Sequence, residues 1–187
     1  MTWLIIILVV AVIIGPIMYL IPTAKDKRLS ELRRLARLQG MNIELTHVPK
    51  LDPASHEQVT AGGKQLTPQI PCAAYRLPIG EAPVDLPTFM LLKMPSEPTL
   101  LLEEVMPDWA LDPKSDLALW RRYNGNDHGA DVLQNVLSLL PDDVLAIAIE
   151  PRFMSCYWRE RAEAADGAVE SIASALGVLR EDLLARF

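Results

Sequence analysis

The sequence predicts an α+β protein with one N-terminal transmembrane helix, a basic juxtamembrane helix, and a small mixed or antiparallel sheet with covering helices. Three observations support this fold class. Residues 3–21 form a run of 19 residues without a charge, which is long enough to cross a bilayer as a helix. After residue 40, apolar residues recur with period 2 in some segments and with period 3.6 in others. About 165 residues follow the anchor, enough for one domain with its own core.

The uncharged run predicts a membrane anchor over residues 1–22. Thirteen of its 19 residues are Leu, Ile or Val, and a helix of that length rises roughly 28 Å, close to the ~30 Å hydrocarbon thickness of a bilayer. Gly15 and Pro16 predict a modest kink. A cleaved signal peptide is disfavoured, because no Lys or Arg precedes residue 25 and no small-x-small cleavage site follows the run.

Basic residues follow the anchor and none precedes it, which predicts the orientation of the chain. Because basic flanks stay on the cytoplasmic side, we expect a periplasmic N-terminus and a cytoplasmic domain at the inner membrane of a bacterium. Six basic side chains are expected to contact the anionic inner leaflet: Lys25, Lys27, Arg28, Arg33, Arg34 and Arg37. Two cysteines, Cys72 and Cys156, fit a reducing compartment.

Charge is divided unevenly along the chain. Residues 23–40 carry six basic and two acidic side chains, a net charge of +4, whereas residues 41–187 carry 12 basic and 22 acidic side chains, a net charge of −10. Nucleic acid repels an acidic body of this kind. We therefore expect the partners to be the lipid bilayer and a protein, with no nucleic acid.

A basic amphipathic juxtamembrane helix is expected at residues 23–40. Its amphipathic pattern runs over residues 28–39, and Gly40 supplies the helix stop. Leu29, Leu32 and Leu35 fall on one side of this helix and the arginines fall on the other. Two interpretations remain open. The helix lies on the membrane surface with its arginines towards phosphates, or it packs its leucines on the cytoplasmic domain.

The cytoplasmic α+β domain is expected over residues 41–187, with a Pro-rich irregular part at residues 49–113. A first strand is predicted at residues 41–48 from its alternation. Eleven of the 15 prolines lie in the irregular part, which limits it to short strands near a sheet edge. These strands are expected at residues 72–79 and 88–94, with a weaker one at 100–105, and a surface loop is expected at 52–68.

Regular elements return after Ser115. Residues 116–123 predict a short helix, with a strand as the alternative, and residues 124–127 predict a turn. A helix over residues 132–140 ends before Pro141, a central strand covered on both sides follows at 144–149, and 153–160 is its hairpin partner. The last helix, from residue 168, covers its own sheet or pairs as a short coiled coil; two heptads favour the first. Its apolar positions are Val169, Ile172, Leu176, Leu179 and Leu183.

No spacing in the sequence is typical of a catalytic, cofactor or metal site. Gly62-Gly63-Lys64 lacks the first glycine and the Ser or Thr of a phosphate-binding loop, and His56-Glu57 lacks a second histidine at residue 60. A possible partner-binding patch combines aromatic and arginine side chains: Trp120, Arg121, Arg122, Trp158 and Arg159. The favoured alternative places the aromatic rings in the core and leaves the arginines solvated or paired.

The layout of the first 40 residues, with one span and the Lys25-Asp26-Lys27-Arg28 collar before a cytoplasmic part, resembles the YajC-type accessory subunit of the bacterial protein translocase. That family has a much shorter cytoplasmic part, without a counterpart of residues 72–187. The whole chain is similar to uncharacterised single-pass inner-membrane proteins of Gram-negative bacteria. Two segments carry this second resemblance: Tyr75-Arg76-Leu77-Pro78 and Tyr157-Trp158-Arg159-Glu160-Arg161. Neither resemblance transfers a catalytic residue.

The sequence therefore predicts a single-pass inner-membrane protein whose cytoplasmic domain is a non-enzymatic adaptor or assembly factor for protein partners. One alternative is a YajC-like accessory role in protein translocation, in which the span itself is the contact surface. A second alternative is a membrane-tethered enzyme, which requires a cleft with converging acids, bases or nucleophiles.

Overall fold

A computed structural model describes residues 23–59, 62–81, 86–100, 102–125 and 127–186, together with residues 2, 3, 6, 7 and 12. Among these described residues, no helix combines the length and the apolar character needed to cross a membrane. The anchor expected at residues 1–22 lies almost entirely outside the described residues and stays a prediction.

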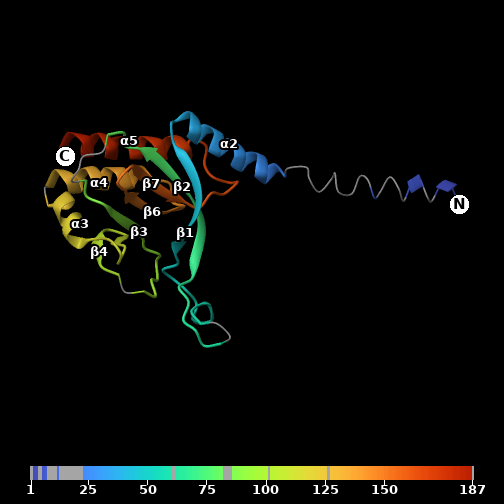
Figure 1. Cartoon of the computed structure of the whole chain (residues 1–187), viewed down its shortest axis with the longest axis horizontal. Coiled ribbons are helices and arrows are strands. Elements are labelled where there is room, and N and C mark those ends of the chain that lie inside the picture. Colours follow the sequence, from blue (N-terminus) through green and yellow to red (C-terminus); the bar gives the residue numbers. More distant parts are fainter. Residues whose placement is uncertain are drawn as a thin grey trace.

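The described residues form one seven-stranded sheet in the order β1-β2-β7-β6-β3-β5-β4 (Figure 1). Every ladder is antiparallel. The α+β class is therefore confirmed, and of the two expected kinds of sheet the antiparallel one is present. The strands are β1 (Asn42–Pro49), β2 (Gln69–Pro78), β3 (Phe89–Lys93), β4 (Glu104–Met106), β5 (Trp109–Leu111), β6 (Val144–Ile149) and β7 (Phe153–Trp158). β6 is central, as its continuous apolar run predicts.

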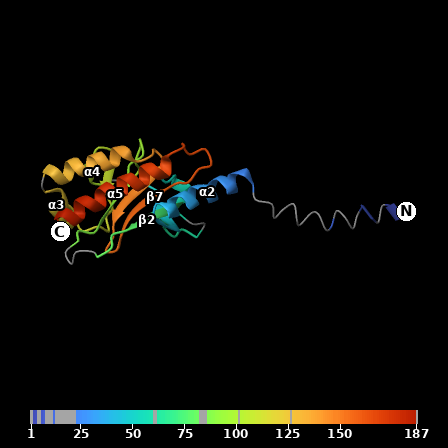
Figure 2. The same cartoon turned by 90° about the horizontal axis from the view of Figure 1, so that it is seen from above.

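Helices cover one face of this sheet (Figures 1 and 2). They are α2 (Ala24–Leu38), α3 (Leu117–Asn124), α4 (Asp127–Leu139) and α5 (Ala168–Arg186); a 3₁₀ turn, Ser55–Glu57, interrupts the expected 52–68 loop. Alternation along the strands divides the core: in β7, Met154, Cys156 and Trp158 join the helix-side cluster, and Tyr157 faces the other side. The helix expected at 116–123 is confirmed, and the strand alternative for that segment is wrong.

The apolar seam of α5 packs on the sheet of its own chain. All five predicted positions from Val169 to Leu183 are at most 1% exposed, because the 3-4 spacing puts them on one side of the helix. This confirms the favoured interpretation. A coiled coil formed by the same five side chains is ruled out in this structure, since none of them is accessible.

Helix α2 begins at its own N-terminal cap and belongs to the domain. The Thr23 side chain and backbone and the Asp26 carboxylate form a reciprocal capping box, which caps the N-terminal end of the helix. Leu32 and Ala36 are buried in the core, so the leucine face packs on the domain and not on a membrane surface. The N-terminal end of α2 projects from the body (Figure 2).

Two loops cover part of the other face of the sheet. The carbonyl oxygen of Leu51 accepts hydrogen bonds from the backbone N–H groups of Thr99 at 3.0 Å and Leu100 at 3.3 Å, which joins the loop after β1 to the loop after β3. Leu51 packs there with Leu92 and a row of small residues on the sheet. We call residues 50–53 and 94–100 the loop layer.

The proline-rich part is more regular than the sequence predicts. β2 starts at Gln69 and includes Pro71, β5 was not expected, and β3 lies inside the sheet and not near an edge. β2 pairs with β1 along its whole length but with β7 only from Ala73. Pro71 therefore interrupts no ladder with β7, because β7 has already ended at that level.

Candidate functional site

The early end of β7 leaves a pocket in the sheet face opposite the helices. Trp158, the last residue of β7, lies opposite Ala73 of β2 and Val144 of β6. The β1–β2 hairpin continues past this point to Pro49 and Gln69. The hairpin on one side and the start of β6 on the other therefore form the walls of an opening that none of the described strands fills. We call this opening the Lys93 pocket.

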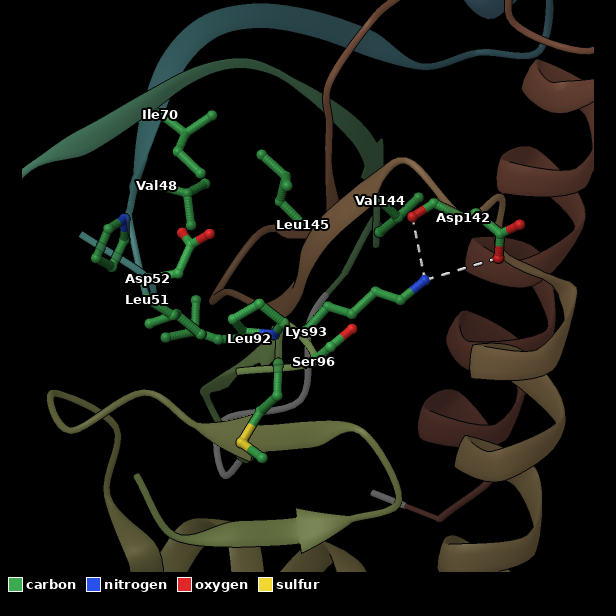
Figure 3. Close-up of a pocket in the computed structure, with 13 residues that line it drawn as sticks. Val48, Leu51, Asp52, Ile70, Leu92, Lys93, Ser96, Asp142, Val144 and Leu145 are labelled. Atoms are coloured by element: carbon green, nitrogen blue, oxygen red, sulfur yellow. Dashed lines mark hydrogen bonds and ion pairs between the residues drawn. The ribbon is translucent and has the colours of Figure 1, made fainter. Parts of the chain in front are cut away.

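The Lys93 pocket has a volume of about 310 Å³. Its apolar lining comes from four strands and the loop layer: Val48, Leu51, Ile70, Leu92, Val144 and Leu145. Figure 3 shows Val48 and Ile70 on the side of the hairpin, with Leu145 facing them from β6. The volume is at the lower end of the range for small-molecule sites, about 300 to 1,000 Å³, and suits one or two large apolar side chains.

Charged groups stand at two sides of this apolar lining. The Lys93 ammonium donates a hydrogen bond to the backbone carbonyl of Asp142 at 3.1 Å and lies 3.9 Å from the Asp142 carboxylate (Figure 3). The Asp142 side chain is fully exposed, so solvent screens this ion pair and it contributes little stability. Asp52 is exposed at the side of the hairpin. The rim thus carries two exposed carboxylates and one cation that is already held.

A polar network lies on the same sheet face, towards the other end of β2 and β6 from the pocket. The Arg76 guanidinium contacts the carboxylates of Glu44 and Glu150, and Ser155 and Tyr157 donate hydrogen bonds to Glu150 at 2.9 and 3.1 Å. Burial, followed by the Glu150 charge, raises the pKa of Tyr157 to about 12. A phenol in this state is no base at neutral pH, and Ser155 has Glu150 as its partner and no histidine. The network ties β1, β2, β6 and β7 together.

The thiols and possible metal ligands are dispersed. Cys72 belongs to the cluster on the pocket side and Cys156 to the cluster on the helix side, so the sheet separates them. Burial raises the pKa of the Cys72 thiol to about 11 and also raises that of Cys156. In the part of the chain that the structure describes, no group of three His, Cys, Asp or Glu is placed to hold a metal ion.

The aromatic residues of the predicted partner-binding patch are in the core. Trp120 and Trp158 are 3% and 1% exposed. The expectation that these two rings contact a partner directly is therefore wrong. Trp120 packs against Phe89, whose strand partner is Ile149 at one end of β6. Trp158 has Val144 as its strand partner, at the other end of β6. The two ends of β6 are roughly 17 Å apart. The exposed arginines Arg121, Arg122 and Arg159 therefore form two separate groups.

The predicted membrane-contact residues have different surroundings. Arg28 pairs with Asp166, Arg33 with Glu160 and Arg34 with Glu31. Lys25, Lys27 and Arg37 are exposed on α2. Contact of these six side chains with lipid stays a prediction. The half-buried Arg33 has a buried partner within the domain, Glu160.

Comparisons of the chain with protein-family models, curated proteins and solved structures found no match. The site is therefore argued from its own geometry. Sequence reasoning missed the Lys93 pocket because its walls come from four segments that are far apart in the sequence, at residues 48–52, 70, 92–96 and 142–145. The one local feature of the sequence that could have pointed to this pocket is Lys93, near the end of the strand predicted at residues 88–94.

Proposed function

We propose that this chain is a membrane-tethered adaptor or assembly factor. Its domain binds protein partners at the cytoplasmic face of a bacterial inner membrane. The observation that carries the proposal is the Lys93 pocket, an apolar opening with exposed carboxylates on its rim. The occupant is an apolar side chain of a protein partner, flanked in the partner by basic residues.

Two charge arguments support a basic partner. Asp52 and Asp142 stand at two sides of the pocket, while Lys93 is already bound to the Asp142 backbone carbonyl. Residues 41–187 carry a net charge of −10, which favours the approach of a basic segment and raises its association rate. An apolar anchor in a pocket with complementary charges at the rim is a common arrangement at protein interfaces.

The position of α2 supports the proposed tether. The capping box at Thr23 begins α2 directly after the expected anchor, and α2 is packed into the core through Leu32 and Ala36. No flexible linker separates α2 from the sheet, because Gly40 alone lies between the α2 C-cap residue Gln39 and the buried Met41. An anchored domain of this kind stays close to the membrane and meets partners there.

The test is affinity capture from detergent-solubilised membranes with four versions of the chain. These are the full chain, a chain that lacks residues 1–22, a pocket variant Leu145→Gln, and a rim variant with Asp52→Asn and Asp142→Asn. Matched controls are Leu184→Gln, an exposed leucine on α5, and Asp131→Asn, an exposed aspartate on α4. We expect one partner that the truncated chain and both controls retain and that the pocket and rim variants lose at least fivefold.

The other outcomes separate the competing functions. A partner that is lost with residues 1–22 but kept by the pocket and rim variants overturns the adaptor and supports the translocase accessory role. A partner that every domain variant retains overturns the Lys93 pocket as the binding site. Turnover of a small molecule by the purified chain, abolished by Leu145→Gln, overturns the non-enzymatic proposal.

A further inference from the structure

Among the residues that the structure describes, β1 is an edge strand that pairs with β2 on one side only, and the backbone groups on its outer side can be identified. The backbone N–H of Lys50 donates to the carbonyl of Pro68 at 2.9 Å, one step beyond the pair Pro49 and Gln69. Because hydrogen-bonded pairs alternate in an antiparallel ladder, the even residues of β1 bond to β2. The N–H and C=O groups of Ile43, Leu45 and His47 therefore point away from the sheet.

This edge has few of the features that protect sheet edges. Natural edge strands are usually short, or they carry lysine, proline or a bulge. β1 has eight residues, no lysine, and a proline only as its last residue, and its pairing with β2 runs without a register shift. Leu45 is 68% exposed at its centre, and Leu38, the last residue of α2, is 70% exposed.

We propose that two copies of this chain pair through β1, antiparallel, about a twofold axis at Leu45. In this register Leu45 lies opposite Leu45 of the second copy, and Ile43 lies opposite His47. All three residues have outward backbone groups, so the strand pair forms six new backbone hydrogen bonds. On the other sheet face Glu44 lies opposite Thr46. The surface is self-complementary, as a twofold interface requires.

Neighbouring registers are less favourable. Centring the axis on Glu44 places two Glu44 carboxylates directly opposite each other, which is destabilising. Centring it on Thr46 places Ile43 opposite Pro49, which has no N–H to donate. A register that places odd-numbered residues of one copy opposite even-numbered residues of the other sets outward backbone groups against inward ones, so it forms no ladder. The axis at Leu45 uses the N–H groups of Ile43, Leu45 and His47 and avoids both the opposed carboxylates and the pairing with Pro49.

Disulfide cross-linking tests this register with the full chain in its own membrane. Leu45→Cys places two thiols opposite each other across a hydrogen-bonded pair, where Cα atoms lie about 5.5 Å apart, within disulfide range. His47→Cys is the matched control, an exposed position on the same strand whose copies are roughly 14 Å apart in this register. Cys72 and Cys156 are 7% and 0% exposed, so they give little background.

We expect mild oxidation to give a species of twice the chain mass for Leu45→Cys, at least tenfold more than for His47→Cys. Co-expressed Ile43→Cys and His47→Cys chains, separately tagged, are expected to cross-link to each other. Absence of the Leu45→Cys dimer, equal cross-linking of His47→Cys, or a Leu45→Cys adduct with a different protein each overturns the proposal. The capture experiment on the Lys93 pocket is independent of all these outcomes.

Discussion

Arg33 of α2 donates hydrogen bonds to both carboxylate oxygens of Glu160, a residue that follows β7. Arg33 Nε lies 3.0 and 3.1 Å from the two oxygens and Nη2 lies 2.5 Å from one of them, while the Tyr75 hydroxyl donates to the same carboxylate at 2.8 Å. The Glu160 side chain is 6% exposed. The hydrogen bonds to Glu160 raise the pKa of Arg33, and the contact fixes α2 on the sheet.

Removing this carboxylate should destabilise the domain. In Glu160→Ala, the buried Tyr75 hydroxyl and the half-buried Arg33 guanidinium lose their partner, and unpaired groups of this kind cost about 2 to 4 kcal/mol of the free energy of unfolding. Urea denaturation of the full chain in detergent measures the loss. Glu31→Ala removes a pair on the exposed side of α2 and is expected to change stability by less than about 0.5 kcal/mol. Equal effects of the two substitutions would contradict the structural role of Glu160.

Three buried tyrosines predict a loss of stability in alkali. Burial, followed by interactions with Glu160, Asp182 and Glu150 respectively, raises the pKa values of Tyr75, Tyr123 and Tyr157. In the unfolded chain a tyrosine ionises near pH 10, whereas the folded state holds the neutral form. The stabilisation is therefore complete below pH 10 and is lost as the pH rises from there towards the folded pKa values.

Each of these tyrosines should contribute about 1.4 kcal/mol per pH unit to that loss. The measurement is the free energy of unfolding from pH 9 to pH 12, with phenolate absorbance recorded in parallel. Tyr75→Phe should lower the slope by one such contribution. If the phenolate absorbance of Tyr75, Tyr123 and Tyr157 rises near pH 10 while the chain is still folded, their pKa values are not raised and the expected loss of stability is excluded.

Local patterns predicted the elements that depend on local packing. The uninterrupted apolar run of β6 and the 3-4 spacing of α5 each describe a buried surface within one segment. β4 and β5 have three residues each, too few for a period to be counted. β5 pairs with β3, and β4 pairs with β5. Pro71 argued against a strand, yet its missing N–H faces the place where β7 has ended.

The candidate site was less predictable than the fold. Arg33 and Glu160 are 127 residues apart in the sequence, and no spacing rule links them. Trp120 and Trp158 lie beside arginines in the sequence, but helix phase and strand alternation turn both rings into the core. The walls of the Lys93 pocket meet only because β7 ends early, which is a property of the tertiary structure.

The capping box at Thr23 should determine where α2 begins. Thr23→Ala removes the hydroxyl that accepts from the Asp26 N–H at 3.2 Å, and loss of such a cap costs about 1 kcal/mol. We expect faster amide hydrogen exchange in the first turn of α2 with no change in α5. Thr23→Ser keeps the hydroxyl and should behave as the unmodified chain. Unchanged exchange in Thr23→Ala would contradict the role of the Thr23 cap.

Two glycines should respond in opposite directions to the same substitution. A Cβ added at Gly40 or at Gly177 meets nothing within 4 Å, so packing does not distinguish them. Gly40 ends α2 with a φ of +77°, a conformation that costs an alanine about 1 kcal/mol. Gly177 lies inside α5, where alanine is favoured by about 0.8 to 1.0 kcal/mol. Thermal unfolding should therefore show Gly40→Ala less stable and Gly177→Ala more stable than the parent chain, and two shifts of the same sign would contradict the backbone conformation at one of these positions.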